Sequence, residues 1–309
     1  MKSLSLTPIQ APAGRPTAFD SGRMLPFAAL LTAALLWGGS FAAMRVAVQA
    51  MSPWSVMWLR MAIALIVILP FAGRLELHRY RRGDWRLLVP MVLFQPCIYF
   101  LLESYALKLT TSSQAGVISA SVPLMVAVGG WCFLSEPLGK RILGGLFLSV
   151  MGVVVLSLCG DVSGSAVNPL LGNALELGAM SSAAVNILLV KRLCDRYNPW
   201  LLTAFQVLAG TLFFSPGLFF LFNGKAVAWT PSLVLGILFL GGLVTLGAFG
   251  LYNWAMSRIP ASRAAMFINM VPVTAVAFGW VMLAESLSMV QCIAAVAVIA
   301  GVAVSQKGP

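Results

Sequence analysis

Long runs of apolar residues, separated by short polar stretches, fill most of the 309-residue chain. Each run comes close to the roughly 20 residues that a helix needs to cross about 30 Å of hydrocarbon. The pattern lacks the short alternating segments of a membrane β-barrel, so we expect an all-α integral membrane protein. The predicted transmembrane helices are ten: 27–47, 54–72, 87–107, 113–134, 142–159, 171–190, 200–221, 232–256, 264–284 and 289–305.

The second half of the chain repeats the skeleton of the first. The segments VPLMVAVGGWCFLSEPL (122–138) and VPVTAVAFGWVMLAESL (271–287) agree at seven of 17 positions without a gap, 149 residues apart. The same offset aligns Phe100 with Phe249 and Gly152 with Gly301. Because the matches include Pro, Gly, Trp and Glu, shared apolar composition does not explain them, and we interpret them as an internal repeat.

Each repeat holds five predicted helices, which is an odd number, so the second repeat enters the membrane from the opposite side. The predicted organisation is a disordered cytoplasmic tail (1–26), a first five-helix repeat (27–160) and a second, inverted five-helix repeat (161–305). Inverted repeats recur in secondary transporters, with the binding site near the membrane midplane between the halves.

The composition agrees with a membrane protein, because 60% of the residues are hydrophobic and only 9% are charged, against about a quarter charged in soluble domains. The formal net charge of +11 reflects topology, since 16 of the 20 Lys and Arg residues fall in the tails and in alternate loops. The positive-inside rule makes that side the cytoplasm. We therefore expect a multi-pass protein of the cell membrane, typical of a bacterial inner membrane, with both termini cytoplasmic and no nucleic-acid partner.

Sequence motifs of enzymes and pumps are missing from the chain. It has no HExxH, no glycine-rich phosphate loop and no Walker motif. The one histidine, His78, falls in a predicted cytoplasmic loop, and the five cysteines show no CxxC spacing. We expect no enzymatic activity, no ATP-driven pumping, no metal and no cofactor.

Several motifs together resemble a known family. They are LLWGGSF at 35–41, WLRMAIAL at 58–65, SYALKLT at 104–110 and the paired VP…GW…E segments. In this order they are similar to the EamA-like branch of the drug/metabolite transporter superfamily. That resemblance implies a ten-helix bundle that exports or exchanges small metabolites, amino acids or drugs by alternating access through a central cavity.

Polar residues inside the predicted helices are candidate site residues, since ionisable groups in hydrocarbon are costly. Gln95, Tyr99 and Glu103 recur every four residues on one helix face. The repeat aligns Glu103 with Tyr252 and Ser104 with Asn253, which predicts a shared cavity. Glu103 is a candidate for proton coupling or for binding a cationic substrate group. In the alternative it is solvated near the outer interface and pairs with Lys108.

Further polar groups at depth are expected to line the cavity or to hydrogen bond between helices. The full set of predicted substrate-binding residues is Trp37, Ser40, Gln95, Tyr99, Glu103, Asn186, Tyr252, Asn253 and Asn269. Glu176, early in the sixth predicted helix, is placed nearer the outside.

Arg45 and Arg60 are predicted near the outer ends of the first two helices. They either reach back to the interface or clamp an anion or carboxylate.

Pro123 and Pro272 each interrupt a predicted helix, either as hinges for alternating access or as kinks that merely shape the bundle. Glu136 and Glu285 are expected to have structural roles at opposite membrane faces, such as capping a neighbouring helix start.

The favoured function is a secondary transporter, in the export direction, of small metabolites such as amino acids or drugs. Its expected partners are a small-molecule substrate, the lipid bilayer and, if export is coupled, protons. The alternative is a passive channel or a lipid- or metabolite-facilitating membrane module without gradient coupling.

Overall fold

The structure, a computed structural model, is an all-α protein over the residues that it describes, which are 21–74, 83–134, 139–159, 166–194, 196–224, 226–258 and 267–306. This confirms the all-α part of the predicted fold class. The helical elements are α1 (Ser21–Ala50), α2 (Pro53–Ile68), η1 (Leu69–Arg74), α3 (Trp85–Val92), η3 (Leu93–Ile98), α4 (Tyr99–Leu109), α5 (Ser112–Ser119), α6 (Val122–Leu134), α7 (Lys140–Leu158), α8 (Pro169–Leu193), α9 (Pro199–Phe213), α10 (Pro216–Asn223), α11 (Pro231–Leu238), η4 (Phe239–Ala248), α12 (Phe249–Met256), α14 (Met270–Leu283) and α15 (Met289–Gln306).

The start of α1 corrects the predicted tail. The helix begins at Ser21 and takes in the last six residues assigned to the tail, while residues 1–20 lie outside the described residues. The predicted boundary between the repeats, at residues 160 and 161, also lies outside the described residues, as does Glu136 with its predicted structural role.

Several helices begin with the same local signal, a polar residue followed by proline. Proline suits the first helical position because the N–H it lacks would have no partner there. The preceding side chain then caps the helix: Asn168 accepts from the N–H of Leu171, and Thr230 accepts from that of Leu233. These capped helix N-termini set where the chain reverses direction.

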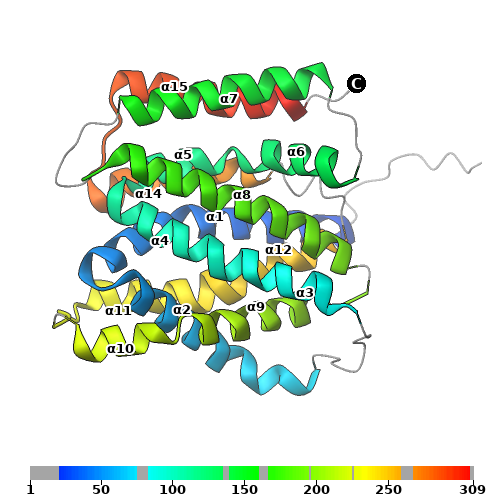
Figure 1. Cartoon of the computed structure of the whole chain (residues 1–309), viewed down its shortest axis with the longest axis vertical. Coiled ribbons are helices and arrows are strands. Elements are labelled where there is room, and N and C mark those ends of the chain that lie inside the picture. Colours follow the sequence, from blue (N-terminus) through cyan, green and yellow to red (C-terminus); the bar gives the residue numbers. More distant parts are fainter. Residues whose placement is uncertain are drawn as a thin grey trace, which may run out of the picture.

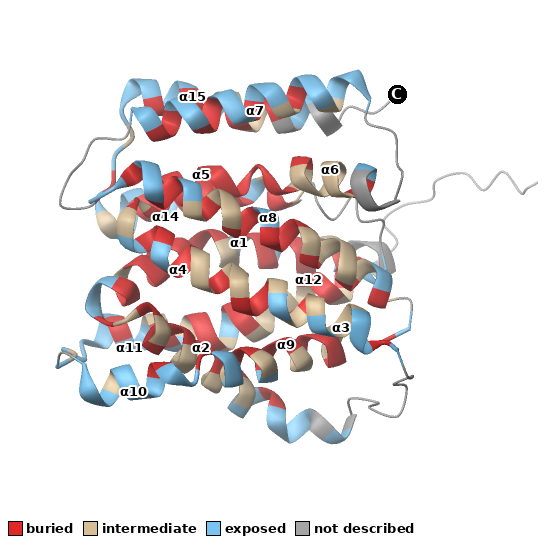
Figure 2. Ribbon diagram, viewed as in Figure 1, coloured by how far each residue is buried: buried red, intermediate tan, exposed pale blue. Residues whose placement is uncertain are grey.

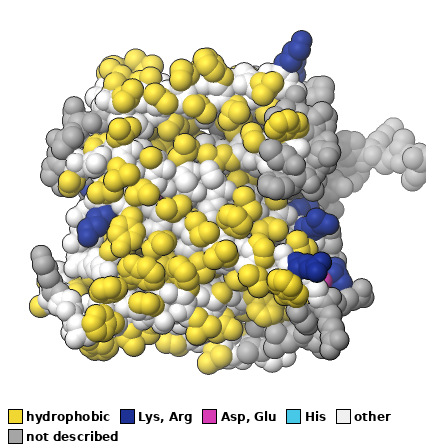
Figure 3. Space-filling view, viewed as in Figure 1, with side chains coloured by type: hydrophobic (Ala, Val, Ile, Leu, Met, Phe, Trp, Pro, Cys, Tyr) yellow, Lys and Arg dark blue, Asp and Glu magenta, His cyan; other side chains and the backbone are white. Residues whose placement is uncertain are grey.

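The helices run back and forth between two ends of one bundle (Figure 1). We call these the Leu109 end, where α4 and α7 finish and α5 and α8 start, and the Leu193 end, where α8 and α12 finish. Large hydrophobic side chains cover the middle of the visible face, and the Lys and Arg side chains seen there lie toward its edges (Figure 3). This is the surface of a multi-pass membrane protein, in which an apolar band meets lipid.

Within the described ranges, seven helices are long and apolar enough to cross a membrane, or eight if the bent pair α9 and α10, which meet at 48°, counts as one span. Two shorter apolar helices, Met270–Leu283 and Met289–Gly301, follow in sequence.

Helices α7 and α15 pack side by side and antiparallel as an outer layer of the bundle, with exposed outer faces (Figures 1 and 2). The two glycines aligned by the sequence repeat make this contact. A Cβ on Gly152 would lie 2.8 Å from the carbonyl oxygen of Ala294, and one on Gly301 would lie 2.5 Å from that of Gly145. The two backbones therefore approach closely. The 149-residue offset aligns Gly145 with Ala294, so Gly152 and Gly301 make equivalent contacts.

The junction between α4 and α5 is held by two buried charges, which we call the Arg45–Glu285 cluster. Glu285 accepts hydrogen bonds from the backbone N–H groups of Ser112 (3.0 Å) and Ser113 (2.9 Å), and from both hydroxyls. Its carboxylate thus caps the start of α5, which confirms the predicted capping role. Arg45 donates to the carbonyls of Leu107 and Thr110 at the end of α4 and lies 3.5 Å from Glu285.

Arg45 is only 6% exposed and lies 3.5 Å from the Glu285 carboxylate where α4 ends; its reach back to the interface stays a prediction. Its guanidinium is buried because the last carbonyls of α4 have no helical partner and need a donor there.

Pro123 and Pro272 both lie in the first turn of a helix rather than in its interior. Helix α5 ends at Ser119, and α6 starts at Val122 after a turn. Asn269 likewise precedes α14, which starts at Met270. The chain is broken before each proline, so neither proline removes a hydrogen bond from a continuous helix. Their role as hinges stays a prediction.

The α7–α15 contact gives a stability prediction. Gly152→Ala should destabilise the protein by about 1–3 kcal/mol, because the added methyl group overpacks a backbone contact. Gly144→Ala is the matched control in the same helix, where a Cβ would meet no atom within 4 Å. It should be neutral or stabilise by up to about 1 kcal/mol through helix propensity. Thermal unfolding in detergent, followed by tryptophan fluorescence, measures both. Equal effects would contradict the close approach.

Candidate functional site

A cavity of about 80 Å³ lies in the centre of the bundle. Its walls come from α1, α2, η3, α4, α5, α6, α8, α12 and α14, together with Ile268 just before α14. Eight of the nine predicted substrate-binding residues line it: Trp37, Ser40, Gln95, Tyr99, Glu103, Asn186, Tyr252 and Asn253. Asn269 is the exception, because it sits at the turn before α14 while the neighbouring Ile268 lines the cavity.

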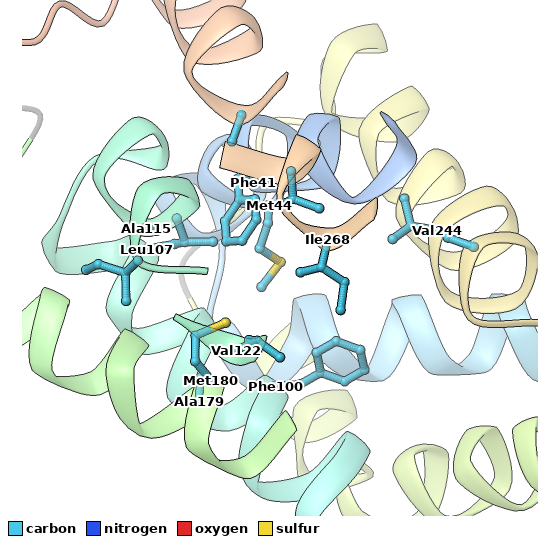
Figure 4. Packing of buried hydrophobic residues seen from close by; sticks show 14 of the residues in the cluster. Phe41, Met44, Phe100, Leu107, Ala115, Val122, Ala179, Met180, Val244 and Ile268 are labelled. Carbon is cyan, nitrogen blue, oxygen red and sulfur yellow. The ribbon is translucent and has the colours of Figure 1, made fainter. Parts of the chain in front are cut away.

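The apolar part of the wall is contributed by several helices. Phe41 of α1, Val122 of α6, Met180 of α8 and Ile268 line the cavity. Figure 4 shows these side chains gathered around one central space, with Phe100 beside them. A polar group that enters is therefore held against apolar surroundings, where unpaired polar atoms are costly.

One side of the cavity carries an ion pair between α2 and α4. Arg60 Nη1 lies 3.8 Å from Glu103 Oε2, and Tyr99 donates its hydroxyl to Glu103 Oε1 at 2.6 Å. The Arg60 guanidinium also lies 4.1 Å from the centre of the Phe100 ring and donates from Nε to Thr245 Oγ1 at 2.5 Å. The side chains of Arg60 and Glu103 are at most 5% exposed, so each buried charge needs the other to compensate it.

This pair corrects two predictions. Arg60 is the eighth residue of the 16-residue α2 and is 2% exposed, so it lies inside the bundle rather than reaching for the interface. Glu103 pairs with Arg60 and not with Lys108, which is exposed at the Leu109 end. Counting Arg60's position within its apolar helix would have placed it at depth.

A second side of the cavity is a network of amides. Asn186 donates to the side-chain oxygen of Gln95 at 2.8 Å, and Gln206 donates to that of Asn186 at 3.1 Å. Asn253 donates to Thr203 Oγ1 at 3.0 Å. The sequence alone did not indicate Gln206 or Thr203, because their partners lie on other helices.

The network surrounds a break in the third predicted helix. Gln95 has extended backbone angles (φ −146°, ψ 119°) between helical neighbours, so the assumption of one continuous helix face through residues 95–103 is wrong. The freed carbonyls find side-chain donors, as buried backbone groups in a membrane must. Ser182 binds the carbonyl of Phe94 at 2.7 Å, and Gln206 binds that of Gln95 at 3.2 Å. Pro96 was the visible signal for this break.

A third side of the cavity is aromatic. The Trp37 ring lies 4.9 Å from that of Tyr252 and 5.3 Å from that of Phe249, measured between centroids. Among the described residues, neither Trp37 Nε1 nor the Tyr252 hydroxyl has a hydrogen-bond partner. The wall therefore combines aromatic faces, which attract cations, with two polar groups available to a bound molecule.

The size of the cavity limits what it holds in this conformation. Its 80 Å³ accommodates a few water molecules and is well below the roughly 300–1,000 Å³ of small-molecule sites. A metabolite therefore enters only after the surrounding helices move apart. No group of three or more His, Cys, Asp or Glu residues in the described ranges could hold a metal.

The ion pair gives a prediction about stability. Arg60→Gln should destabilise the protein by about 3–5 kcal/mol, because it leaves the Glu103 carboxylate buried without its partner. Arg60→Lys should cost less, since it keeps the charge while losing the bond from Nε to Thr245. Thermal unfolding in detergent is the measurement, with the exposed Lys108→Gln as the control for loss of a positive charge. A Gln variant as stable as this control would exclude a buried pair.

Comparison with known proteins finds similarity over most of the chain. The EamA-like transporter family matches it twice, over residues 24–158 and 170–306. An uncharacterized transporter, YetK, of Bacillus subtilis (strain 168) is 29% identical over 205 residues, which cover 65% of this chain and 62% of YetK. An uncharacterized transporter of Archaeoglobus fulgidus is 25% identical over 271 residues, covering 87% of this chain and 92% of that protein.

A solved crystal structure has a similar fold, with a TM-score of 0.61 at 20% identity, and the match covers 93% of this chain and 96% of that one. The family consists of membrane transporters, which supports the expectation that the protein is not an enzyme. Since the two matches together account for most of the sequence, the chain belongs to the EamA-like transporter family.

Proposed function

We propose that this membrane transporter exports small metabolites, such as amino acids or drugs, by alternating access through the central cavity. The observation that carries the proposal is the cavity itself. It lies in the middle of an apolar bundle, and its wall combines an ion pair, an amide network and aromatic groups. Charged and polar groups in such surroundings are costly and serve substrate pathways.

The proposed architecture is ten membrane helices in two inverted repeats. Ten spans result when the seven long helices, the bent pair α9–α10 as one span and the two shorter apolar helices all cross the membrane. Contacts between equivalent positions support the inversion. The antiparallel helices α7 and α15 touch through Gly152 and Gly301, as a two-fold axis requires. The irregular segments η3 and η4 also fall at aligned places.

A second pair of contacts supports the same axis. Arg45 donates to the carbonyl of Leu107 at the Leu109 end, and Lys191 donates to the carbonyl of Met256, at 3.5 Å, at the Leu193 end. Leu107 and Met256 are aligned by the 149-residue offset. Each end of the bundle thus has a cation holding the end of a cavity helix, which suits a protein that opens at one end at a time.

The charge distribution supports an orientation with both termini in the cytoplasm of a bacterial inner membrane. Among the described residues, Lys140, Arg141, Lys191 and Arg258 lie at the Leu193 end, whereas Lys108 lies at the Leu109 end. The positive-inside rule makes the Leu193 end cytoplasmic.

Residues of both charge signs in the cavity favour zwitterionic or amine-bearing substrates. Glu103 offers a carboxylate to an ammonium group, Arg60 offers guanidinium donors to a carboxylate, and Trp37 and Tyr252 offer unpaired donors beside aromatic faces. Amino acids fit this combination, as do many drugs with an amine and an aromatic ring.

A transport assay tests the function. Proteoliposomes preloaded with single compounds from an amino-acid and cationic-drug panel should show faster uptake of the labelled compound when the same compound is inside. Glu103→Gln should reduce this counterflow about tenfold or more, because a hydrogen bond to a charged group contributes about 1.5–3 kcal/mol. Tyr105→Phe, at an exposed position, is the matched control. Saturable uptake without stimulation from inside would instead favour a passive channel.

Cysteine labelling tests the inversion. The repeat aligns Lys108 with Ser257, and both are exposed at opposite ends of the bundle. In a cysteine-free background, Lys108→Cys should react with a membrane-impermeant maleimide added outside intact cells. Ser257→Cys should react only after the membrane is opened. Labelling of both positions from the same side would exclude inverted repeats.

A further inference from the structure

Glu176 is a buried acid on α8 that lies opposite Glu103 on α4. The two helices pack antiparallel. A Cβ on Gly178 would lie 3.2 Å from Leu102, and one on Gly172 would lie 3.1 Å from the carbonyl of Ala106. Glu103 follows Leu102 on one helix, and Glu176 lies between the two glycines on the other. The register therefore brings the two carboxyl groups together, and they interact electrostatically.

The surroundings of Glu176 differ from those of the other buried acids. It is 0% exposed, and neither of its carboxyl oxygens has a hydrogen-bond partner among the described residues. Glu285, by contrast, accepts from two backbone N–H groups and two hydroxyls. Glu103 has Tyr99 and Arg60. An isolated charge in such a place is so costly that a carboxyl group takes up a proton instead.

The charged and titratable groups near Glu176 leave its charge uncompensated. Tyr99 and Glu103 face it from α4, and both interact with it. Among the described residues that line the cavity, Arg60 on α2 is the cation, and it is paired with Glu103. Its guanidinium thus compensates the charge of Glu103 and not that of Glu176.

Helix α4 also carries Tyr105 and Lys108, which are exposed and lie toward the Leu109 end. The remaining titratable side chains described on helices packed against α8 lie toward the Leu193 end. They are Cys97 on η3, Arg86 on α3, and Lys140 and Arg141 on α7. Helix α5, which packs on the Leu109 half of α8, carries no titratable group. None of these groups supplies a counter-charge beside Glu176.

We propose that Glu176 holds the exchangeable proton of this transporter, while Glu103 stays ionised as the partner of Arg60. Two neighbouring carboxyl groups, of which one has a cationic partner and the other has none, do not both ionise. The hydroxyl of Tyr99 and the guanidinium of Arg60 both stabilise the charged form of Glu103, so the proton resides on Glu176. A metal cation in this place would need several oxygen ligands, whereas a proton needs one.

The exchange of this proton for a substrate rests on the proposed transport function. When the cavity opens, the O–H bond of Glu176 breaks, the proton passes to water, and the electron pair remains on the carboxylate. Helix α8 then carries one further negative charge beside the cavity. Met180, one turn along α8, lines the cavity, so this charge acts on a bound molecule. One protonated amine can then replace one proton, which assigns amine-bearing compounds as the substrate class.

Infrared spectroscopy of the purified protein in lipid tests this inference without a substrate. A protonated carboxyl group has a carbonyl stretching band of its own. The wild type at neutral pH should show this band, and the band should shift in D₂O because the proton exchanges. Glu176→Gln, which is close to isosteric, should lose it. Glu285→Gln is the matched control at another buried acid, and it should keep the band because it leaves Glu176 unchanged.

Three results would overturn the proposal. The band could be absent in the wild type, it could survive Glu176→Gln and vanish in Glu103→Gln, or it could fail to shift in D₂O, which would make Glu176 a permanently neutral structural acid. If Glu176→Gln does not fold, Glu176→Asp must shift the band, and an unchanged band there also overturns the assignment. Failed counterflow with this band present would contradict only the proposed transport function.

Discussion

Backbone groups that lose their helical partners constrain much of this structure, because hydrocarbon offers no water to satisfy them. At the break beside Gln95, side chains of Ser182 and Gln206 bind the freed carbonyls. At the junction of α4 and α5, Arg45 binds the last carbonyls of one helix and Glu285 binds the first N–H groups of the next. Each break in a helix thus requires hydrogen bonds from polar side chains elsewhere in the bundle. These hydrogen bonds help to determine which helices are neighbours.

The same requirement explains why polar groups gather at the cavity. Gln95 on η3 and Asn186 on α8 belong to the hydrogen-bond network around the broken helix, and they also line the central space. Local rules of sequence are broken where function is expected. An extended residue inside a helix and a buried acid without a hydrogen-bond partner among the described residues are both of this kind.

Much of the fold could be predicted from the sequence, because lipid contact forces the hydrophobic pattern to follow the helices. The repeat offset also predicted that Glu103 and Tyr252 would meet in one cavity, and both line it. Predictions failed where they depended on partners distant in sequence. The burial of Arg60 depends on Glu103 and Thr245, and the place of Glu176 depends on the register between two helices. No local pattern contains that information.

The small volume of the cavity affects how a measured substrate affinity should be interpreted. Because 80 Å³ is too little for a metabolite, binding must be accompanied by expansion, and the free energy of that expansion is subtracted from the contact energy. The measured dissociation constant equals the intrinsic one divided by the fraction of molecules already expanded. Weak apparent binding is therefore compatible with a well-matched site, and a substitution that merely loosens the bundle would look like an improvement in recognition.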